Sequence, residues 1–495
     1  MNGMAKRQYG DARPGTSLVA EPPPRSPRRW LRRTLLTVAA GGAAAGVALT
    51  LLPREAPQRA PHRPPAPAPG PQARALTAVT TGVPAALPDL TELITRQESG
   101  VRARPADARA WAVLGAAYVA RANRTADAAD LPRAERALGT SLKARGTKNT
   151  EALAGMTALA NARRDFASAK RYGEQALKLT PKRWSAYPPL IDAYNGLGDY
   201  TAARNTLDKL MALRTTPADR PAVMARASAV YRDRGWREDA LAQLTDAAAA
   251  AGTPAEQAAY RAGVGQLAWE RGELPEALRQ FTEALRLDPA EATAGAGKAR
   301  TLAAQGRTAA ALTAYHEALA KRPDAEVTLE LAELYESLNR TQDAEAQYEL
   351  VRKRAEKATS DGVDEELLLG RLEADHGDPQ EAVTRLRAEY QRQPGIEVAD
   401  ALGWALHRAG KGEEALKFAT TATDRTKGGG VRSALHDFHR GMIEYELERY
   451  GSARRQLEDA LLVNPAFSPL WAPEARAALR DMGEVTEGPL PADVL

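Results

Sequence analysis

Two histidines come closest, in type and spacing, to a reactive site in this 495-residue chain. His436 and His439 lie three residues apart, so one face of a helix would present two imidazole nitrogens that could hold a metal ion. Two ligands alone make a poor metal site, and the chain has no cysteine to add a third. Asp437 points elsewhere by helical spacing. The pattern therefore favours histidines of a surface or a groove over a metal centre.

A phosphate-binding loop is the second chemistry that the residue types suggest. The run from Gly295 to Lys298 reads Gly-Ala-Gly-Lys, but a phosphate loop requires Ser or Thr after the lysine and a strand before it. Ala299 follows the lysine, and the sequence has no cysteine nucleophile, nucleophile elbow or zinc-protease motif. We therefore expect a chain that is not an enzyme and that holds no cofactor or metal. A cryptic hydrolase or metal-handling protein using His436 and His439 is the least favoured alternative.

The helices that must position any site are marked by a repeated alanine. Successive members of the series are 33 to 38 residues apart. A period of this size is typical of a helical solenoid, whose long concave surface usually binds another molecule. The ten members are Ala134, Ala169, Ala203, Ala240, Ala277, Ala311, Ala344, Ala382, Ala415 and Ala453.

The residues around these alanines repeat as well. Residues 111–118 read Trp-Ala-Val-Leu-Gly-Ala-Ala-Tyr, and the unit at 261–289 places an aromatic residue and a closing proline after its alanine, as does the next unit. This joint pattern resembles the tetratricopeptide repeat over about residues 105–467. The resemblance implies an all-α fold, a right-handed helical solenoid of about ten helix-turn-helix repeats. The aromatic and proline positions are Phe281 and Pro289, then Tyr315 and Pro323.

Glycines fit two positions of such a unit. Gly265 and Gly403 would let the first helix of a unit approach its partner closely. Other glycines stand where the first helix must end, and there glycine supplies a left-handed cap. These are Gly198, Gly235, Gly272, Gly306, Gly377 and Gly410.

The segments before the repeats predict a membrane anchor. Residues 1–33 are basic, residues 34–52 carry no charge, and residues 53–86 are rich in proline. A charge-free run of this length just reaches across a bilayer core, and the basic flank predicts a cytoplasmic N-terminus with the repeats outside the cytoplasm. The alternative is a cleaved export signal followed by secretion, because Arg32 and Arg33 resemble a twin-arginine signal. The proline-rich segment would act as a semi-rigid linker.

The rest of the chain divides into three parts. We expect the solenoid at residues 87–467, a capping helix at 468–482 and a disordered tail at 483–495. We also expect the solenoid to fold without the first 86 residues, because anchor and linker contribute no packed surface.

The net charge of +5 is no sign of nucleic-acid binding. Residues 1–33 carry +6 and residues 53–86 carry +3, so the remainder sums to about −4. A mildly acidic solenoid with mixed signs is not a phosphate-binding surface. The excess of arginine over lysine is interpreted as codon bias of a GC-rich, bacterial genome.

The groove residues follow from the register of the resemblance, in which exposed positions of each first helix line the concave face. Three are arginines of earlier units, and five are aromatic residues, a methionine and a histidine in the last two units, which could dock a hydrophobic partner segment. The alternative is that the five pack between units or under the terminal helix. The candidate residues are Arg232, Arg300, Arg371, Trp404, His407, Phe438, Met442 and Tyr445.

Three functions fit these expectations. The first is a non-catalytic scaffold that presents a protein-binding groove outside the cytoplasm on a membrane anchor. The second is an accessory subunit that positions an envelope enzyme or transporter. The third is the cryptic metal-handling protein or hydrolase. The partner is expected to be a protein or peptide, and the membrane is contacted through residues 34–52.

Overall fold

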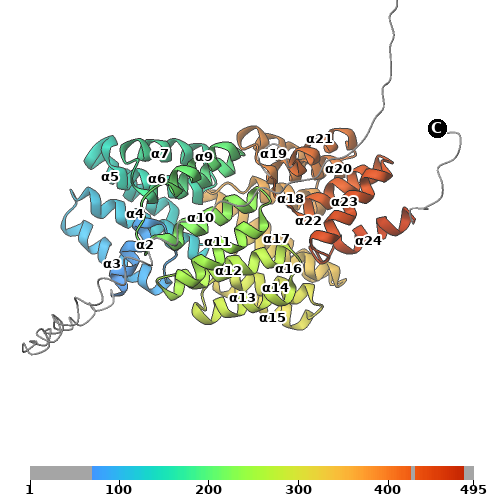
Figure 1. Cartoon of the computed structure of the whole chain (residues 1–495), viewed down its shortest axis with the longest axis horizontal. Helices are drawn as coiled ribbons and strands as arrows, with labels where there is room; N and C mark the ends of the chain where they lie inside the picture. The colour runs from blue at the N-terminus through green and yellow to red at the C-terminus, as the bar shows by residue number, and fades with distance from the viewer. Residues whose placement is uncertain (1–69, 425–429, 484–495) are drawn as a thin grey trace, which may run out of the picture. The chain divides into compact units, whose positions relative to one another are not determined.

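The computed structural model describes residues 70–424 and 430–483, and these residues are helical without any strand (Figure 1). Two helices, α2 (Pro71–Thr81) and α3 (Leu87–Ala103), precede the repeats, and α24 (Trp471–Asp481) follows them. Two short 3₁₀ turns, η1 (Gly146–Lys148) and η2 (Trp184–Ala186), lie in the connectors of the first units.

Ten antiparallel helix pairs make up the solenoid, as the sequence predicts. In each pair the two helices contact each other extensively, and the pairs follow one another along the chain. The first five are α4 (Ala108–Thr125) with α5 (Asp130–Arg145), α6 (Thr150–Ala162) with α7 (Phe166–Leu179), α8 (Tyr187–Gly196) with α9 (Tyr200–Met211), α10 (Arg220–Asp233) with α11 (Arg237–Ala250), and α12 (Pro254–Glu270) with α13 (Leu274–Leu287). The last five are α14 (Ala292–Ala304) with α15 (Thr308–Lys321), α16 (Ala325–Ser337) with α17 (Thr341–Ser360), α18 (Glu366–His376) with α19 (Pro379–Arg392), α20 (Ile396–Arg408) with α21 (Gly412–Thr423), and α22 (Ala434–Glu446) with α23 (Tyr450–Val463).

The repeated alanines occupy the closest contacts of the solenoid. All ten are buried, each with at most 2% of its surface exposed, and each lies on the second helix of its unit. Small side chains at these positions let the two helices of a unit pack closely. The alanine period therefore marks helix packing, as predicted.

Glycine makes room for larger side chains on the opposite helix. A Cβ atom added to Gly265 would lie 2.8 Å from the ring of Phe281, and one added to Gly297 would lie 2.3 Å from it. Phe281 is fully buried on α13 and thus fills the space between the first helices of two successive units. Of the predicted left-handed caps, Gly272 has a φ of 72° and Gly377 differs, with a φ of −156°.

The boundary expected at residue 87 differs from the structure. Residues 71–81 form α2, which buries Ala75 and Ala78 against the first units. Arg74 on this helix pairs with Asp89 on α3 at 3.0 Å. The sequence pattern missed this helix because proline at its first turn, which helices tolerate, resembles the end of a proline-rich linker.

Removing α2 is expected to destabilise the domain. A chain that starts at residue 82 exposes the apolar surface that Ala75 and Ala78 cover and leaves Asp89 without Arg74. We expect its melting temperature to fall by several °C relative to a chain that starts at residue 70, which keeps the whole helix. Circular dichroism melts of the two chains measure this. Equal melting temperatures would contradict a packing role for α2.

The expected membrane segment, residues 34–52, lies outside the described residues, as does most of the tail at 483–495. Among the helices that the structure does describe, none combines the length and the apolar character that a membrane crossing needs. The basic segment 1–33 also lies outside the described part of the chain.

Successive turns of the solenoid touch each other. The hairpin turns of early units contact the connectors of later ones, more than 160 residues further along the chain. Arg164 pairs with Glu365 at 2.6 Å, and the Asn464 amide donates to the carbonyl of Trp269 at 2.8 Å. Arg124 pairs in the same way with both Asp288 and Glu291. The first helices thereby enclose the concave side instead of leaving it as an open groove.

Candidate functional site

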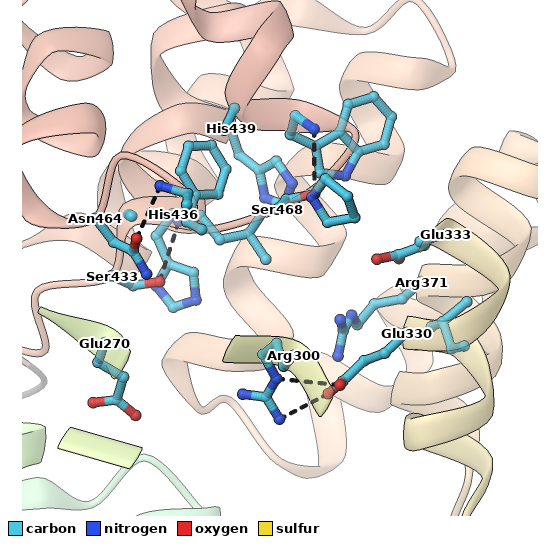
Figure 2. Close-up of a pocket in the computed structure, with 18 of the residues that line it drawn as sticks. Glu270, Arg300, Glu330, Glu333, Arg371, Ser433, His436, His439, Asn464 and Ser468 are labelled. Carbon is cyan, nitrogen blue, oxygen red and sulfur yellow. Dashed lines mark hydrogen bonds and ion pairs between the residues drawn. The ribbon is translucent and has the colours of Figure 1, made fainter. Parts of the chain in front are cut away.

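The concave side holds a cavity of about 660 Å³. First helices from α10 to α22 supply most of its wall, and the connectors before α22 and α24, together with α24 itself, supply most of the remainder (Figure 2). Its lining is mostly charged or aromatic, unlike the apolar core beneath it. The charged and aromatic members used below are Arg232, Trp269, Glu270, Arg300, Glu330, Glu333, Arg371, Asp375, Glu397, Asp400, Trp404, Arg432, His436, His439, Phe467 and Trp471.

Ion pairs join neighbouring first helices across this wall. Arg232 binds both carboxylate oxygens of Glu270, with Nη2 to Oε1 at 2.8 Å and Nε to Oε2 at 2.9 Å. Arg300 pairs with Glu330 at 2.9 Å (Figure 2). Gln266 joins the two pairs, because it donates to Glu270 and accepts from Arg300. A continuous polar ladder therefore runs from α10 to α16, and two of the predicted groove arginines belong to it.

A second charged cluster joins α20 to α22. His439 Nδ1 lies 2.9 Å from Asp400 Oδ2, and His436 Nε2 lies 3.3 Å from Glu397 Oε2 and 3.7 Å from the same Asp400 oxygen. His436, His439 and Asp400 are all buried. The two histidines thus share a carboxylate from the preceding unit, and the spacing of three that put them on one face also brings both to Asp400.

The cluster holds His436 in its charged form. Burial alone lowers the pKa of this imidazole, but the nearby carboxylates of Asp400 and Glu397 outweigh it and raise the pKa to about 9. Burial raises the pKa of Asp400, and the two histidines lower it below its usual value. A protonated histidine is no metal ligand, and no group of three or more potential metal ligands is found among the described residues.

The arrangement offers no nucleophile to these histidines. Ser433 lies close to His436 in Figure 2, but its Oγ accepts a hydrogen bond from the backbone N–H of His436 at 3.3 Å and so caps α22. Asp400 pairs with both histidine rings. The three residues therefore form structural ion pairs instead of a relay that passes a proton to or from a nucleophile.

Trp404 lines the cavity, yet it is almost fully buried. Its indole N–H donates to Asp375 at 2.9 Å, and its ring stacks on His439 with centroids 4.3 Å apart. Trp471 of α24 meets it edge-on at 5.8 Å. The residue therefore combines a place in the wall with a packing role between units and the terminal helix.

The other four residues of the expected hydrophobic patch do not line the cavity. Phe438 is fully buried against Phe467 and Trp471, and Met442 belongs to the same apolar cluster. The patch expected to be open is thus covered by α24 and the segment before it. This geometry matches the alternative of packing under the terminal helix.

His407 and Tyr445 lie at the edge of that packing. Burial, together with the nearby charges of His439 and Arg408, lowers the pKa of His407 to about 4, so its ring is neutral at pH 7 against Trp404. Tyr445 donates its hydroxyl to Asp481 at the end of α24. The Tyr445 contact holds the last unit to its cap, whereas the His407 contact lies within α20.

Arg371 is the predicted arginine with accessible charge. It lies on α18, is exposed on the cavity wall, and forms no hydrogen bond or ion pair with the described residues. Figure 2 shows its guanidinium directed into the cavity, near Glu330 and Glu333. Arg371 therefore differs from Arg232 and Arg300, whose charges are already neutralised.

A second cavity of about 740 Å³ lies on the concave side of the first three units. Its wall is rich in alanine from α4 and α6, and the segment between α2 and α3 forms part of it. Charged side chains, among them Arg109, Glu151, Asp192 and Arg226, also line this cavity.

Several charged wall residues were not predicted from the sequence, chiefly Glu270, Glu330, Asp400 and Arg432. The spacing of some of these residues, which is close to the repeat length, could have predicted them. Arg232 and Glu270 are 38 residues apart, and Asp400 and His439 are 39 apart, so each pair occupies nearly the same register position in adjacent units. Opposite charges one repeat apart predict such ladders.

Comparison with known proteins gives one family and several distant structures. The tetratricopeptide repeat family model matches residues 297–359 and 367–429. Human IFIT1, solved as a dimer with PPP-AAAA, is 16% identical over 64% of this chain and 72% of its own, with a TM-score of 0.43. A tetratricopeptide repeat protein from Parabacteroides merdae is 18% identical over 54% of this chain and 100% of its own (TM-score 0.32), and yeast Tom70 is 13% identical over 74% and 96% (TM-score 0.33).

The search of curated proteins finds no match.

The family match covers α15 to α21 and most of α14, and these helices supply Arg300, Glu330, Arg371 and Asp400 to the cavity wall. The same helix-pair architecture continues on either side of the matched segments. The chain is therefore a helical repeat protein, and its residues 297–359 and 367–429 match the tetratricopeptide repeat family model.

Proposed function

We propose that this chain is a non-catalytic scaffold that captures a segment of a partner protein in the cavity formed by its first helices. The cavity itself carries the proposal. It is lined by side chains suited to recognition, among them the unpaired Arg371 and the half-buried Trp269 and Trp471, while the groups that could do chemistry are held in structural ion pairs. Concave solenoid surfaces commonly serve such binding.

Photo-crosslinking tests this proposal. A photoreactive amino acid at Ala304, on the cavity wall, is expected to crosslink the partner protein in living cells, whereas the same group at Glu349, exposed on α17 outside the cavity, is not. Mass spectrometry of the adduct identifies both the partner and the captured segment. Crosslinks from Glu349 alone, or from neither position, would contradict a cavity-binding function.

The presentation of the repeats outside the cytoplasm is a part of the same proposal. It is supported by the sequence alone, by the basic residues of 1–33 ahead of the charge-free residues 34–52. Protease added to spheroplasts should digest the repeats and spare the first thirty or so residues. Protected repeats would overturn this topology. An accessory role would follow if the captured partner belongs to an envelope enzyme or a transporter.

A further inference from the structure

Most charged side chains on the cavity wall are already neutralised by the protein. Arg232 is paired with Glu270, Arg300 with Glu330, and Asp400 with the two histidines of α22. A side chain that already forms a well-formed ion pair binds a charged ligand less well, because the ligand would have to break that pair. The groups available to a ligand are therefore those without a partner.

Two guanidinium groups on the wall meet that condition. Arg371 on α18 is exposed and forms no hydrogen bond or ion pair with the described residues. Arg432, in the connector before α22, also lacks an ion pair there, and its Nε is buried without a hydrogen-bond partner. The two come from different elements of the same wall.

The carboxyl of Glu333, which lies near Arg371, does not cancel its charge. Burial raises the pKa of Glu333, Arg371 lowers it in part, and Asp375 and Glu330 raise it again, to about 8. At neutral pH this carboxyl is mostly protonated, so it can donate a hydrogen bond next to the free guanidinium.

We propose that the cavity selects an acidic segment of its partner, with carboxylate side chains that bind Arg371 and Arg432. This inference rests on the proposed function and adds the chemistry of the segment. Carboxylates form short, charge-assisted, bidentate hydrogen bonds with arginine. Half-buried Trp269 and Trp471, together with Leu435, lie on the same wall, so apolar side chains next to the acidic ones are accommodated.

The wall favours a peptide over a nucleic acid. A nucleic acid carries one charge per nucleotide, and its backbone would meet the carboxylates of Glu270, Glu330 and Glu397 along with the arginines. A peptide can place isolated carboxylates at the two free guanidinium groups and uncharged residues elsewhere.

Fluorescence anisotropy with the full-length chain tests the inference. The probe is a fluorescein-labelled peptide of alternating glutamate and leucine, compared with its lysine counterpart, a labelled oligouridylate and inorganic phosphate as competitor. We expect the glutamate peptide to bind best. Arg371→Ala should weaken it by about tenfold to a hundredfold, since hydrogen bonds to charged groups are worth this much. Arg279→Ala, at an exposed arginine on α13, is the matched control and should change nothing.

A charge reversal makes the test sharper. Arg371→Glu should lose the glutamate peptide and gain the lysine peptide, and a thermal melt of the variant checks that it still folds, because the new carboxylate lies near Glu330 and Glu333. Three outcomes would overturn the inference. The parent and Arg371→Ala could bind the glutamate peptide equally well, or the parent could prefer the lysine peptide or the oligouridylate. Phosphate could also compete as strongly as the glutamate peptide. If Ala304 still crosslinks a partner in the Arg371→Glu chain, the scaffold function stands and the acidic specificity fails. If Ala304 never crosslinks, the scaffold function itself fails.

Discussion

Phe281→Ala is expected to lower the free energy of unfolding by about 3–5 kcal/mol, the range for phenylalanine removed from a packed core. The ring is fully buried between Gly265 of its own unit and Gly297 of the next. The two glycines lie inside α12 and α14 and have no side chain that could move into the space, so the cavity left by the ring collapses poorly. Chemical denaturation of the purified domain, followed by circular dichroism, measures the loss.

The matched control for this prediction is Leu462→Ala on α23. Leu462 is 77% exposed, so the same kind of truncation should change stability by less than about 0.5 kcal/mol. A Phe281→Ala variant as stable as Leu462→Ala would mean that the glycine–phenylalanine contact does not hold units five and six together.

Asp400→Asn is expected to destabilise the last two units by about 3 kcal/mol at neutral pH. The substitution removes the charge that His436 and His439 share and leaves an imidazolium buried with Glu397 as its remaining partner. Breaking a buried ion pair from one side typically costs about 3–5 kcal/mol. The rise of the His436 pKa from 6.5 to about 9 corresponds to a similar energy, of about 3 kcal/mol.

This effect should depend on pH in a defined direction. The pKa of His436 is higher in the folded chain than in the unfolded one, so its stabilisation is complete below pH 6.5 and disappears as the pH rises through about 9. Glu333, with its raised pKa, also makes stability fall with rising pH, but it does so in parent and variant alike. The difference between Asp400→Asn and the parent should therefore shrink from pH 6 to pH 9.

Urea titrations at pH 6, 7.5 and 9 measure that difference. Asp343→Asn, which breaks an exposed ion pair with Arg340, serves as the control and should cost under about 1 kcal/mol at each pH. A difference that stays constant from pH 6 to pH 9 would show that Asp400 is not what keeps His436 protonated in the folded chain.

Much of the fold follows from the sequence because close packing restricts residue type. Positions such as Ala277, where two helices nearly touch, admit only small side chains, and Phe281 requires glycines opposite to it. Such restrictions recur with the repeat and are therefore visible in one chain. α2 escaped prediction because its contacts with the first units occur once and leave no period.

The site was harder to predict, for a related reason. The repeat register describes which face of a first helix is concave, and the three arginines that it selects, Arg232, Arg300 and Arg371, lie on the cavity wall. The register could not show which of these arginines form ion pairs within the protein. Glu330, the partner of Arg300, does not occupy one of its positions. The register also could not show that Phe438 is covered, because that depends on how α24 folds back over the last unit.

The contacts between turns change how the domain responds to force and to heat. In a solenoid whose units touch only their neighbours, folding can start anywhere and ends can unravel singly. Here, ion pairs and hydrogen bonds span 164 to 201 residues, so loss of one unit also removes support from another five or so units away. Folding must close these long loops, which slows it. Tension applied at the two ends would act first on the ion pairs Arg124–Asp288 and Arg164–Glu365. The domain therefore resists stretching until those ion pairs break.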